Sequence, residues 1–154
     1  MKLIRTGKTR LCFHLAQREQ RLLLQLLKLY PRVPATYPTL SRSGRLPEPE
    51  ANQRLLNEAL AEQRAENQQR VQALLADPRR LRETEGGWHL SLTHAEVEWL
   101  LQLLNDIRVG SWIRLGSPDE TRVALNEATA AHVWAMELSG YFQAQLLEAV
   151  GGAA

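Results

Sequence analysis

Cysteine is almost absent from this chain of 154 residues. The single Cys12 excludes an internal disulfide and leaves no cysteine-based zinc site. Long apolar runs are also absent, since none reaches the roughly 18 residues that a membrane-spanning helix needs. After the basic start of the chain, Arg18, Glu19 and Arg21 interrupt the apolar residues that a signal peptide would require. These absences predict a cytoplasmic protein that does not span a membrane.

The usual signatures of catalysis and metal binding are missing as well. The sequence contains no P-loop and no GxGxxG, GxSxG or HExxH motif. Its histidines are scattered, and no two of them stand four residues apart, as a helical metal site would require. Recognisable nucleic-acid modules such as zinc fingers are absent too. We therefore expect a non-enzymatic protein that uses no cofactor and binds no metal.

Charge is distributed unevenly along the chain. Residues 1–49 hold ten Lys or Arg and two acidic residues, which gives a net charge of +8. Residues 50–154 hold nine Lys or Arg and fifteen acidic residues, which gives −6, so the net charge of the whole chain is +2. The basic third could bind an acidic partner such as nucleic acid. The alternatives are that it faces the acidic two-thirds of the same molecule or is simply solvated.

Apolar periodicity and turn residues predict a mainly α fold, namely one domain of four helices with one or two short β-hairpins at one end. The expected elements, in chain order, are a hairpin over 1–16, a helix over 17–30, a proline-rich loop over 31–49, a long helix over 50–76, a hairpin over 81–92, a central helix over 93–115 and a C-terminal helix over 126–150. Thr93 and Glu96 form a capping box that starts the central helix. Asn126 is the expected cap of the last helix.

The central helix is predicted to have one solvent-facing stripe, formed by Glu98, Gln102 and Asn105. The opposite, apolar arc consists of Leu100, Leu103, Leu104 and Ile107. Arg114 falls within that arc, where an isolated charge would be costly. It is therefore expected either to pair with Asp119, Glu120 or the last helical carbonyls or to reach out past the end of the helix, the alternative being an anion-binding role.

Three further residues of the central helix are candidates for contacts with other elements. Asp106 and Arg108 flank the polar stripe on opposite sides, so each is expected to bond a different neighbour. Trp112 lies near the stripe. Either it forms an exposed partner-binding patch beside Arg108, or the N-terminal helix or a hairpin covers it.

The C-terminal helix carries a stripe of mostly small residues that favours close packing. Its members are Ala128, Ala131, Ala135, Leu138, Phe142, Leu146 and Ala149. His132 and Ser139 fall within this stripe, so His132 is predicted to be a buried core histidine. A catalytic role as general base would require one pocket that joins His132 with Asp106 or Glu137.

Two other segments could face a partner. The long helix is apolar at both ends, but residues 61–70 are almost wholly polar, which is typical of a helix that packs at its ends and bridges, protrudes or faces a ligand in the middle. The proline-rich loop contains Arg42 and Arg45. It is either a solvated linker or a basic arm that becomes ordered on a partner.

The segment LNDIRVGSWIRLGSPDE, residues 104–120, resembles an uncharacterised bacterial family found mainly in actinobacteria. Members of that family share a helical leucine-Asn-x-leucine-Arg segment followed by Arg-Leu-Gly, and the matching positions here are Asn105, Arg108, Arg114, Leu115 and Gly116. The similarity covers the C-terminal half, residues 90–151, and Trp112 stands where the family has glycine. The resemblance implies a helical fold, and proximity of family genes to a Clp protease adaptor implies a link to protein quality control.

These observations favour a protein-interaction or adaptor module that binds a protein partner or a second copy of itself as a homodimer. The predicted partner-binding residues are Arg108, Trp112, Arg42 and Arg45, and the predicted structural polar residues are Asn105, Asp106, Arg114 and His132. The alternative is a nucleic-acid-binding protein that uses residues 1–49.

Overall fold

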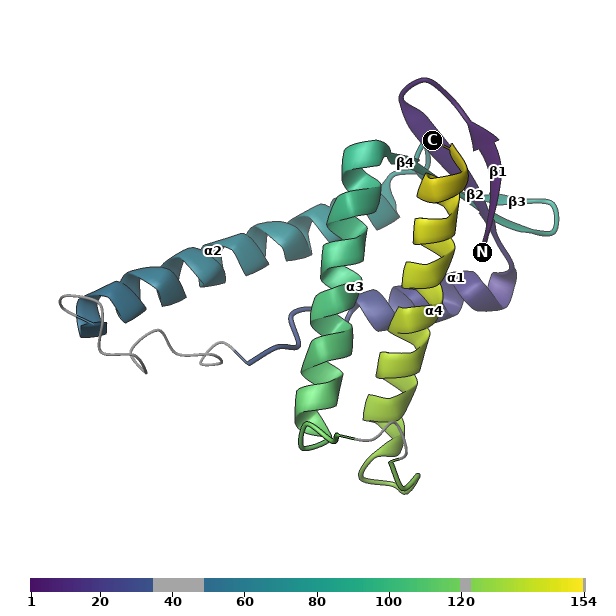
Figure 1. Cartoon of the computed structure of the whole chain (residues 1–154). Coiled ribbons are helices and arrows are strands. Elements are labelled where there is room, and N and C mark those ends of the chain that lie inside the picture. Colours follow the sequence, from purple (N-terminus) through teal and green to yellow (C-terminus); the bar gives the residue numbers. More distant parts are fainter. Residues whose placement is uncertain (35–48, 120–122, 154) are drawn as a thin grey trace.

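The computed structural model describes residues 1–34, 49–119 and 123–153, which form four helices and one four-stranded antiparallel sheet (Figure 1). The strands are β1 (Lys2–Thr6), β2 (Arg10–Leu15), β3 (Leu81–Thr84) and β4 (Gly87–Thr93). The helices are α1 (Gln17–Leu27), α2 (Pro49–Ala76), α3 (His94–Arg114) and α4 (Ala130–Ala153). The prediction of a mainly helical fold with a small β component is therefore confirmed.

The layout nevertheless differs from the predicted four-helix domain, because the two predicted hairpins form one four-stranded sheet. Strand order β1-β2-β4-β3 joins both hairpins into one sheet through the pairing of β2 with β4. Alternation along the strands places Leu11, Phe13, Leu90 and Leu92 on one face, where all four are buried. Two hairpins that are marginal alone thus share a single apolar face, which packs against the helices.

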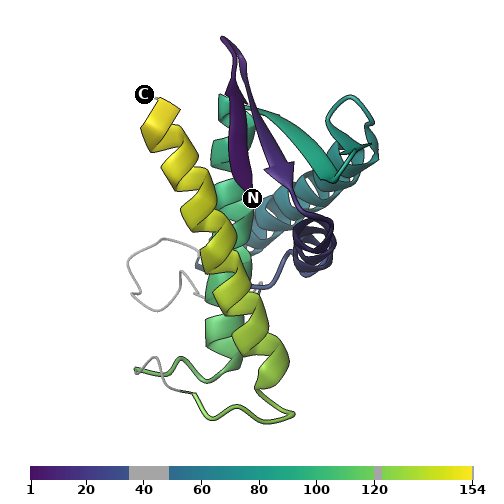
Figure 2. The same cartoon turned by 90° about the vertical axis from the view of Figure 1, so that its right-hand side faces the viewer.

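Helix α3 leads from the sheet, and α4 returns beside it in the opposite direction (Figures 1 and 2). The predicted capping box is confirmed, because the Thr93 hydroxyl accepts a hydrogen bond from the Glu96 amide and the Glu96 carboxylate accepts one from the Thr93 amide, both at 3.1 Å. The predicted solvent stripe is exposed and the predicted apolar arc is buried. The helical period alone therefore oriented α3 correctly.

Helix α4 begins at Ala130, four residues later than predicted. The Asn126 side chain accepts hydrogen bonds from the amides of Ala128 and Thr129 at 2.9 and 3.1 Å, so it caps a short turn ahead of the helix. Ala128 consequently lies outside the helix, and Ala131 is exposed. The remainder of the predicted stripe does face the core, where Ala135, Ser139, Phe142, Leu146 and Ala149 are buried and Leu138 is partly buried.

Helix α1 ends at Leu27, three residues before its predicted end. Lys28 is its C-cap, and the amides of Leu29 and Tyr30 donate to the carbonyls of Leu26 and Leu27 in a tightened final turn. The helix therefore stops before Pro31 rather than running up to it.

Helix α2 extends away from the rest of the molecule as a long arm (Figure 1). Its C-terminal end packs as predicted, with Val71 and Leu74 buried, whereas Leu55 near its start is 64% exposed. The polar middle is partly anchored, because Asn67 accepts a hydrogen bond from the Trp99 indole at 3.0 Å and donates one to the Tyr30 hydroxyl at 2.9 Å.

Of the described helices, none is long and apolar enough to cross a membrane.

Candidate functional site

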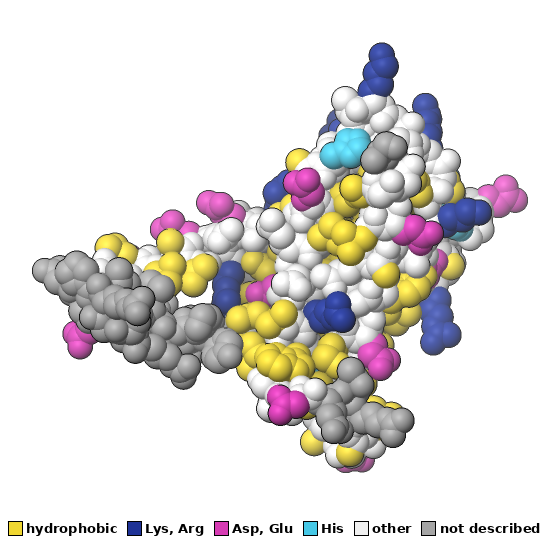
Figure 3. Space-filling view, in the orientation of Figure 1, with side chains coloured by type: hydrophobic (Ala, Val, Ile, Leu, Met, Phe, Trp, Pro, Cys, Tyr) yellow, Lys and Arg dark blue, Asp and Glu magenta, His cyan; other side chains and the backbone are white. Residues whose placement is uncertain are grey.

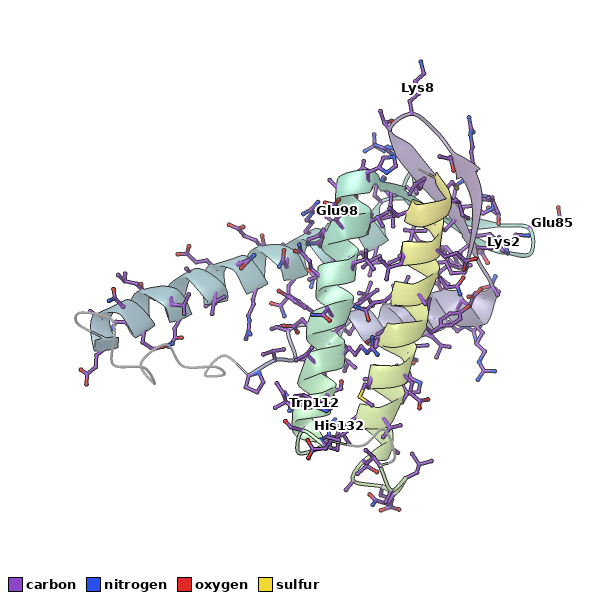
Figure 4. The ribbon with its side chains drawn as sticks, viewed as in Figure 1. Lys2, Lys8, Glu85, Glu98, Trp112 and His132 are labelled. Carbon is purple, nitrogen blue, oxygen red and sulfur yellow. The ribbon has the colours of Figure 1, made fainter. Side chains whose placement is uncertain are left out.

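A groove between α3 and α4, near the connection that joins them, is the best candidate for a binding site. It encloses about 690 Å³ and is called the Trp112 groove below. The residues that line it are Asn105, Arg108, Val109, Trp112, Pro118, Asp119, Val123, Met136, Glu137 and Gly140. Figure 3 shows hydrophobic side chains gathered over the lower ends of α3 and α4 with a dark blue side chain beside them, and Figure 4 places Trp112 at this end of α3.

Trp112 is an exposed and anchored aromatic residue within the Trp112 groove. Its side chain is 37% exposed, and its indole N–H donates to the Pro118 carbonyl at 3.0 Å. The prediction that the N-terminal helix or a hairpin covers it is wrong, because the sheet lies at the other end of α3 and α1 crosses beside the middle of α3 (Figure 1). The hydrogen bond fixes one edge of the ring, so the accessible ring surface is held in place before any partner binds.

Arg108 supplies a positive charge next to that ring. Its guanidinium donates to the Gln143 side-chain oxygen on α4 at 3.3 Å, which confirms the predicted contact to a neighbouring element. Gly140 on α4 faces the guanidinium, and a Cβ at that position would lie 3.7 Å from the Arg108 Cζ, an ordinary contact distance. One hydrogen bond leaves most of the guanidinium donors available to a partner.

Asp106 lies on another side of α3 and binds the chain that follows α1. Its carboxylate accepts hydrogen bonds from the backbone amides of Arg32 and Val33, at 2.7 and 3.3 Å. Gly110 lies one turn farther along the helix, and a Cβ there would come within 2.4 Å of the Arg32 carbonyl carbon. Asp106 and Gly110 together therefore form the place where the chain leaving α1 docks on α3. Sequence reasoning missed Gly110, although a glycine inside an apolar helix is a recognised sign of close packing.

His132 lies at the edge of this docking site rather than in the core. Its ring is partly exposed, and its Nδ1 lies 2.6 Å from an Nη of Arg32. Because a guanidinium only donates, Nδ1 must be the acceptor, which requires a neutral ring protonated at Nε2. Burial, followed by the charges of Arg32 and Arg114, lowers the pKa of His132 below its ordinary value.

Arg114 does not occupy the apolar environment predicted for it. The last turn of α3 runs past the core, so the side chain is exposed, and among the described residues it forms no ion pair with Asp119. The other predicted partner, Glu120, lies outside the described residues. The positive charge of Arg114 acts instead on Arg32. Burial lowers the pKa of Arg32, and the charge of Arg114 lowers it further.

The structure thus separates the predicted site residues into two groups. Asn105, Arg108 and Trp112 line the Trp112 groove, whereas Asp106, Arg114 and His132 surround Arg32. Glu137 lines the groove with the first group, and His132 is not among the residues that line it. Asp106 bonds the backbone at Arg32 and His132 bonds its side chain, and the described hydrogen bonds include none between this carboxylate and the imidazole. Arg42 and Arg45 lie outside the described residues.

Acidification is expected to destabilise the protein through His132. At pH values above the unfolded-state pKa of about 6.5, both states hold a neutral ring. As the pH falls below that value, the unfolded chain takes up a proton that the folded state resists because its pKa is lower, so the free energy of unfolding falls. Urea titrations at pH 7.5 and 5.5 should show this fall in the parent protein and a smaller fall in His132→Asn, whose side-chain oxygen can still accept from Arg32.

His94→Asn is the matched control, because it replaces an exposed histidine away from Arg32. It should lose stability with acidification as the parent protein does. An identical pH dependence in His132→Asn and the parent protein would contradict the assignment of the effect to His132.

Across residues 1–34, 49–119 and 123–153, no group of three or more His, Cys, Asp or Glu side chains is arranged to hold a metal ion. Comparisons with protein-family models, with curated proteins and with solved structures give no match to this chain. The resemblance of residues 104–120 to an actinobacterial family accordingly stays a prediction.

Proposed function

We propose that this chain is a protein-interaction module that binds its partner in the Trp112 groove. The observation that carries the proposal is the exposed Trp112 ring, held by its bond to Pro118, beside the incompletely bonded guanidinium of Arg108. Tryptophan and arginine are the residues most enriched among those that dominate binding energy at protein interfaces. Both project from α3, which packs against α4 and so gives them a rigid support.

The shape and charge of the groove indicate the kind of segment that would fit. A groove between two antiparallel helices accepts an amphipathic helix whose apolar residues enter between them. A carboxylate on that helix would suit Arg108, because a carboxylate and a guanidinium form a strong bidentate pair. Asp119 and Glu137, which also line the groove, would oppose a second carboxylate near them and so set the orientation. The partner segment is therefore an amphipathic helix that has one acidic residue beside the apolar residue that enters the groove.

Photo-crosslinking tests whether a partner occupies the groove. A benzophenone side chain at Val109, which lines the groove, should capture a partner that the same side chain at Leu147 does not, because Leu147 is 59% exposed but is not among the groove residues. Mass photometry of the purified protein distinguishes a second copy of this chain from a different partner. Strictly monomeric protein with no capture at Val109 would contradict the proposal.

Truncating the aromatic anchor is then expected to weaken binding of the identified partner. Trp112→Ala should raise the dissociation constant about 30-fold, which corresponds to the roughly 2 kcal/mol typical of a dominant interface residue. Leu55→Ala is the matched control, since Leu55 is 64% exposed on α2 and should leave the affinity within about twofold. Equal affinities for Trp112→Ala and the parent protein would show that the groove is not the binding site.

Two related hypotheses extend this proposal. The resemblance of residues 104–120 to a family encoded near a Clp protease adaptor would make the partner a component of protein quality control. The alternative, nucleic-acid binding through residues 1–49, concerns a separate surface, because the described basic residues of that segment lie on the β1–β2 hairpin, on α1 or in the chain after α1 rather than in the Trp112 groove.

A further inference from the structure

The sheet has one apolar face against the helices and one open face that is strongly basic. Strand register places Lys2 beside His14, His14 beside His89 and His89 beside Arg82, so these four side chains form one row across all four strands. A second row, from Arg5 through Cys12 to Ser91, runs next to it, and Arg10 stands beyond that row. On β2, β3 and β4 these positions alternate with buried ones, and on β1 the register sets Lys2 and Arg5 beside His14 and Cys12, so the side chains lie on the open face.

A hollow of about 550 Å³ lies on this open face. The residues that line it are Arg5, Gly7, Thr9, Arg10, Cys12, Pro78, Arg79, Arg80, Arg82, His89 and Ser91. Five of them are arginines, and the lining contains no aspartate or glutamate. The hollow and the row from Lys2 to Arg82 are together called the basic sheet face below. Its charge is contributed by both hairpins, including the one that belongs to the acidic part of the chain.

The arginines of the basic sheet face differ in how they are held. Arg79 forms an ion pair with Asp77 at 3.3 Å, and Arg80 bonds Glu96 and donates to the Ser91 carbonyl, so these two are engaged within the protein. Arg5, Arg10 and Arg82 are exposed, and none of the three forms an ion pair with a described residue. Three guanidinium groups from three different strands are therefore free to bind an external anion.

We propose that the basic sheet face binds single-stranded nucleic acid through its phosphate backbone. Neighbouring strands lie about 4.8 Å apart and alternate residues on one strand about 6.8 Å apart, so the guanidinium groups are spread over a surface about 14 Å wide. Such a spread matches a polymer that carries repeated negative charges better than a single small anion. Lys8, at the tip of the β1–β2 hairpin, extends the positive charge beyond the hollow (Figure 4).

The two histidines give the basic sheet face planar groups as well as charge. The rings of His14 and His89 meet edge to face with their centroids 5.6 Å apart, in the middle of the row between Lys2 and Arg82. Unstacked bases of a single strand bind to such rings and to arginine planes. The bases of a duplex are paired and stacked, so a duplex offers no free base faces to these rings. A single strand is therefore favoured over a duplex.

Fluorescence anisotropy with a labelled 20-nucleotide single strand, as RNA and as DNA, tests this proposal on the full chain. Three phosphate contacts predict a salt slope of about −2, so that raising the salt from 50 to 200 mM weakens binding about 20-fold. The triple variant Arg5→Gln, Arg10→Gln, Arg82→Gln should bind about tenfold more weakly or worse at 50 mM salt. Trp112→Ala should bind as the parent protein does, which separates this proposal from the Trp112 groove.

The control variant Arg18→Gln, Arg21→Gln, Arg54→Gln removes the same net charge from exposed positions on α1 and α2 and should bind within about twofold of the parent protein. Arg82→Glu alone, which leaves β1 and β2 unchanged, gives an independent loss of binding if the triple variant fails to fold. Equal losses in the two triple variants would overturn the proposal, because binding would then follow total charge. Absence of binding at 50 mM salt, or preference for a duplex, heparin or anionic vesicles, would also overturn it.

Discussion

Replacing Gly110 with alanine is expected to lower the free energy of unfolding by about 2–4 kcal/mol, since overpacking costs about 1–3 kcal/mol and unpaired amides add to it. The added Cβ would lie 2.4 Å from the Arg32 carbonyl carbon and 2.6 Å from the Arg32 oxygen and the Val33 nitrogen. These are backbone atoms, which cannot rotate away as a side chain would. Moving them would also lengthen the two hydrogen bonds that the Asp106 carboxylate accepts from Arg32 and Val33.

Gly140→Ala is the matched control, because Gly140 also lies inside a long helix. A Cβ at this position would be 3.7 Å from the nearest atom, an ordinary contact, so alanine should be neutral or should stabilise the helix by up to about 1 kcal/mol. Urea unfolding followed by circular dichroism measures both variants. Equal stabilities of the two variants would show that the approach of residues 32 and 33 to α3 is not close.

Replacing Phe142 with alanine is expected to cost about 3–5 kcal/mol of unfolding free energy, the usual range for a buried aromatic residue. Phe142 is 1% exposed on α4, whose other buried side chains are mostly small: Ala135, Ser139, Leu146 and Ala149. Phe142 and Leu146 are the large side chains of this helix that are fully buried. Loss of the ring would leave a cavity between α4 and the rest of the core.

Leu147→Ala provides the comparison for Phe142→Ala on the same helix. Leu147 is 59% exposed, so its truncation should change the free energy of unfolding by no more than about 0.5 kcal/mol. Thermal and urea unfolding of both variants give the two differences. A similar small loss in both would mean that α4 is held by contacts other than the Phe142 ring.

The Trp112 groove and the basic sheet face lie on different elements, the first on α3 and α4 and the second on the open side of the sheet (Figures 1 and 4). The proposed protein partner and the proposed nucleic acid would therefore not compete for the same residues. Trp112→Ala changes only the Trp112 groove, and the triple variant of Arg5, Arg10 and Arg82 changes only the basic sheet face. The two variants therefore test the proposed protein binding and the proposed nucleic-acid binding separately.

Local patterns in the sequence determined much of the secondary structure. The period of two along residues 88–92 predicted β4, and the Thr93 and Glu96 capping box predicted the start of α3. The predicted start of α4 was wrong, because the residues there carry signals for both a helix cap and a turn. Asn126 has the chemistry of a helix cap, yet it closes a turn instead, and α4 begins only after Thr129. The side chain of Asn126 suits either role, so the local pattern does not say which of the two it takes.

The sequence by itself determined that the chain forms amphipathic helices and two hairpins, and which face of α3 is apolar, because these follow from side-chain period and turn chemistry within a few residues. Only the tertiary structure decided that the hairpins join through β2 and β4, that Arg114 passes beyond the core, and that Asp106 and Gly110 receive the chain after α1. Those contacts join residues far apart in the chain, and they are fixed by burial and hydrogen bonding in the folded molecule.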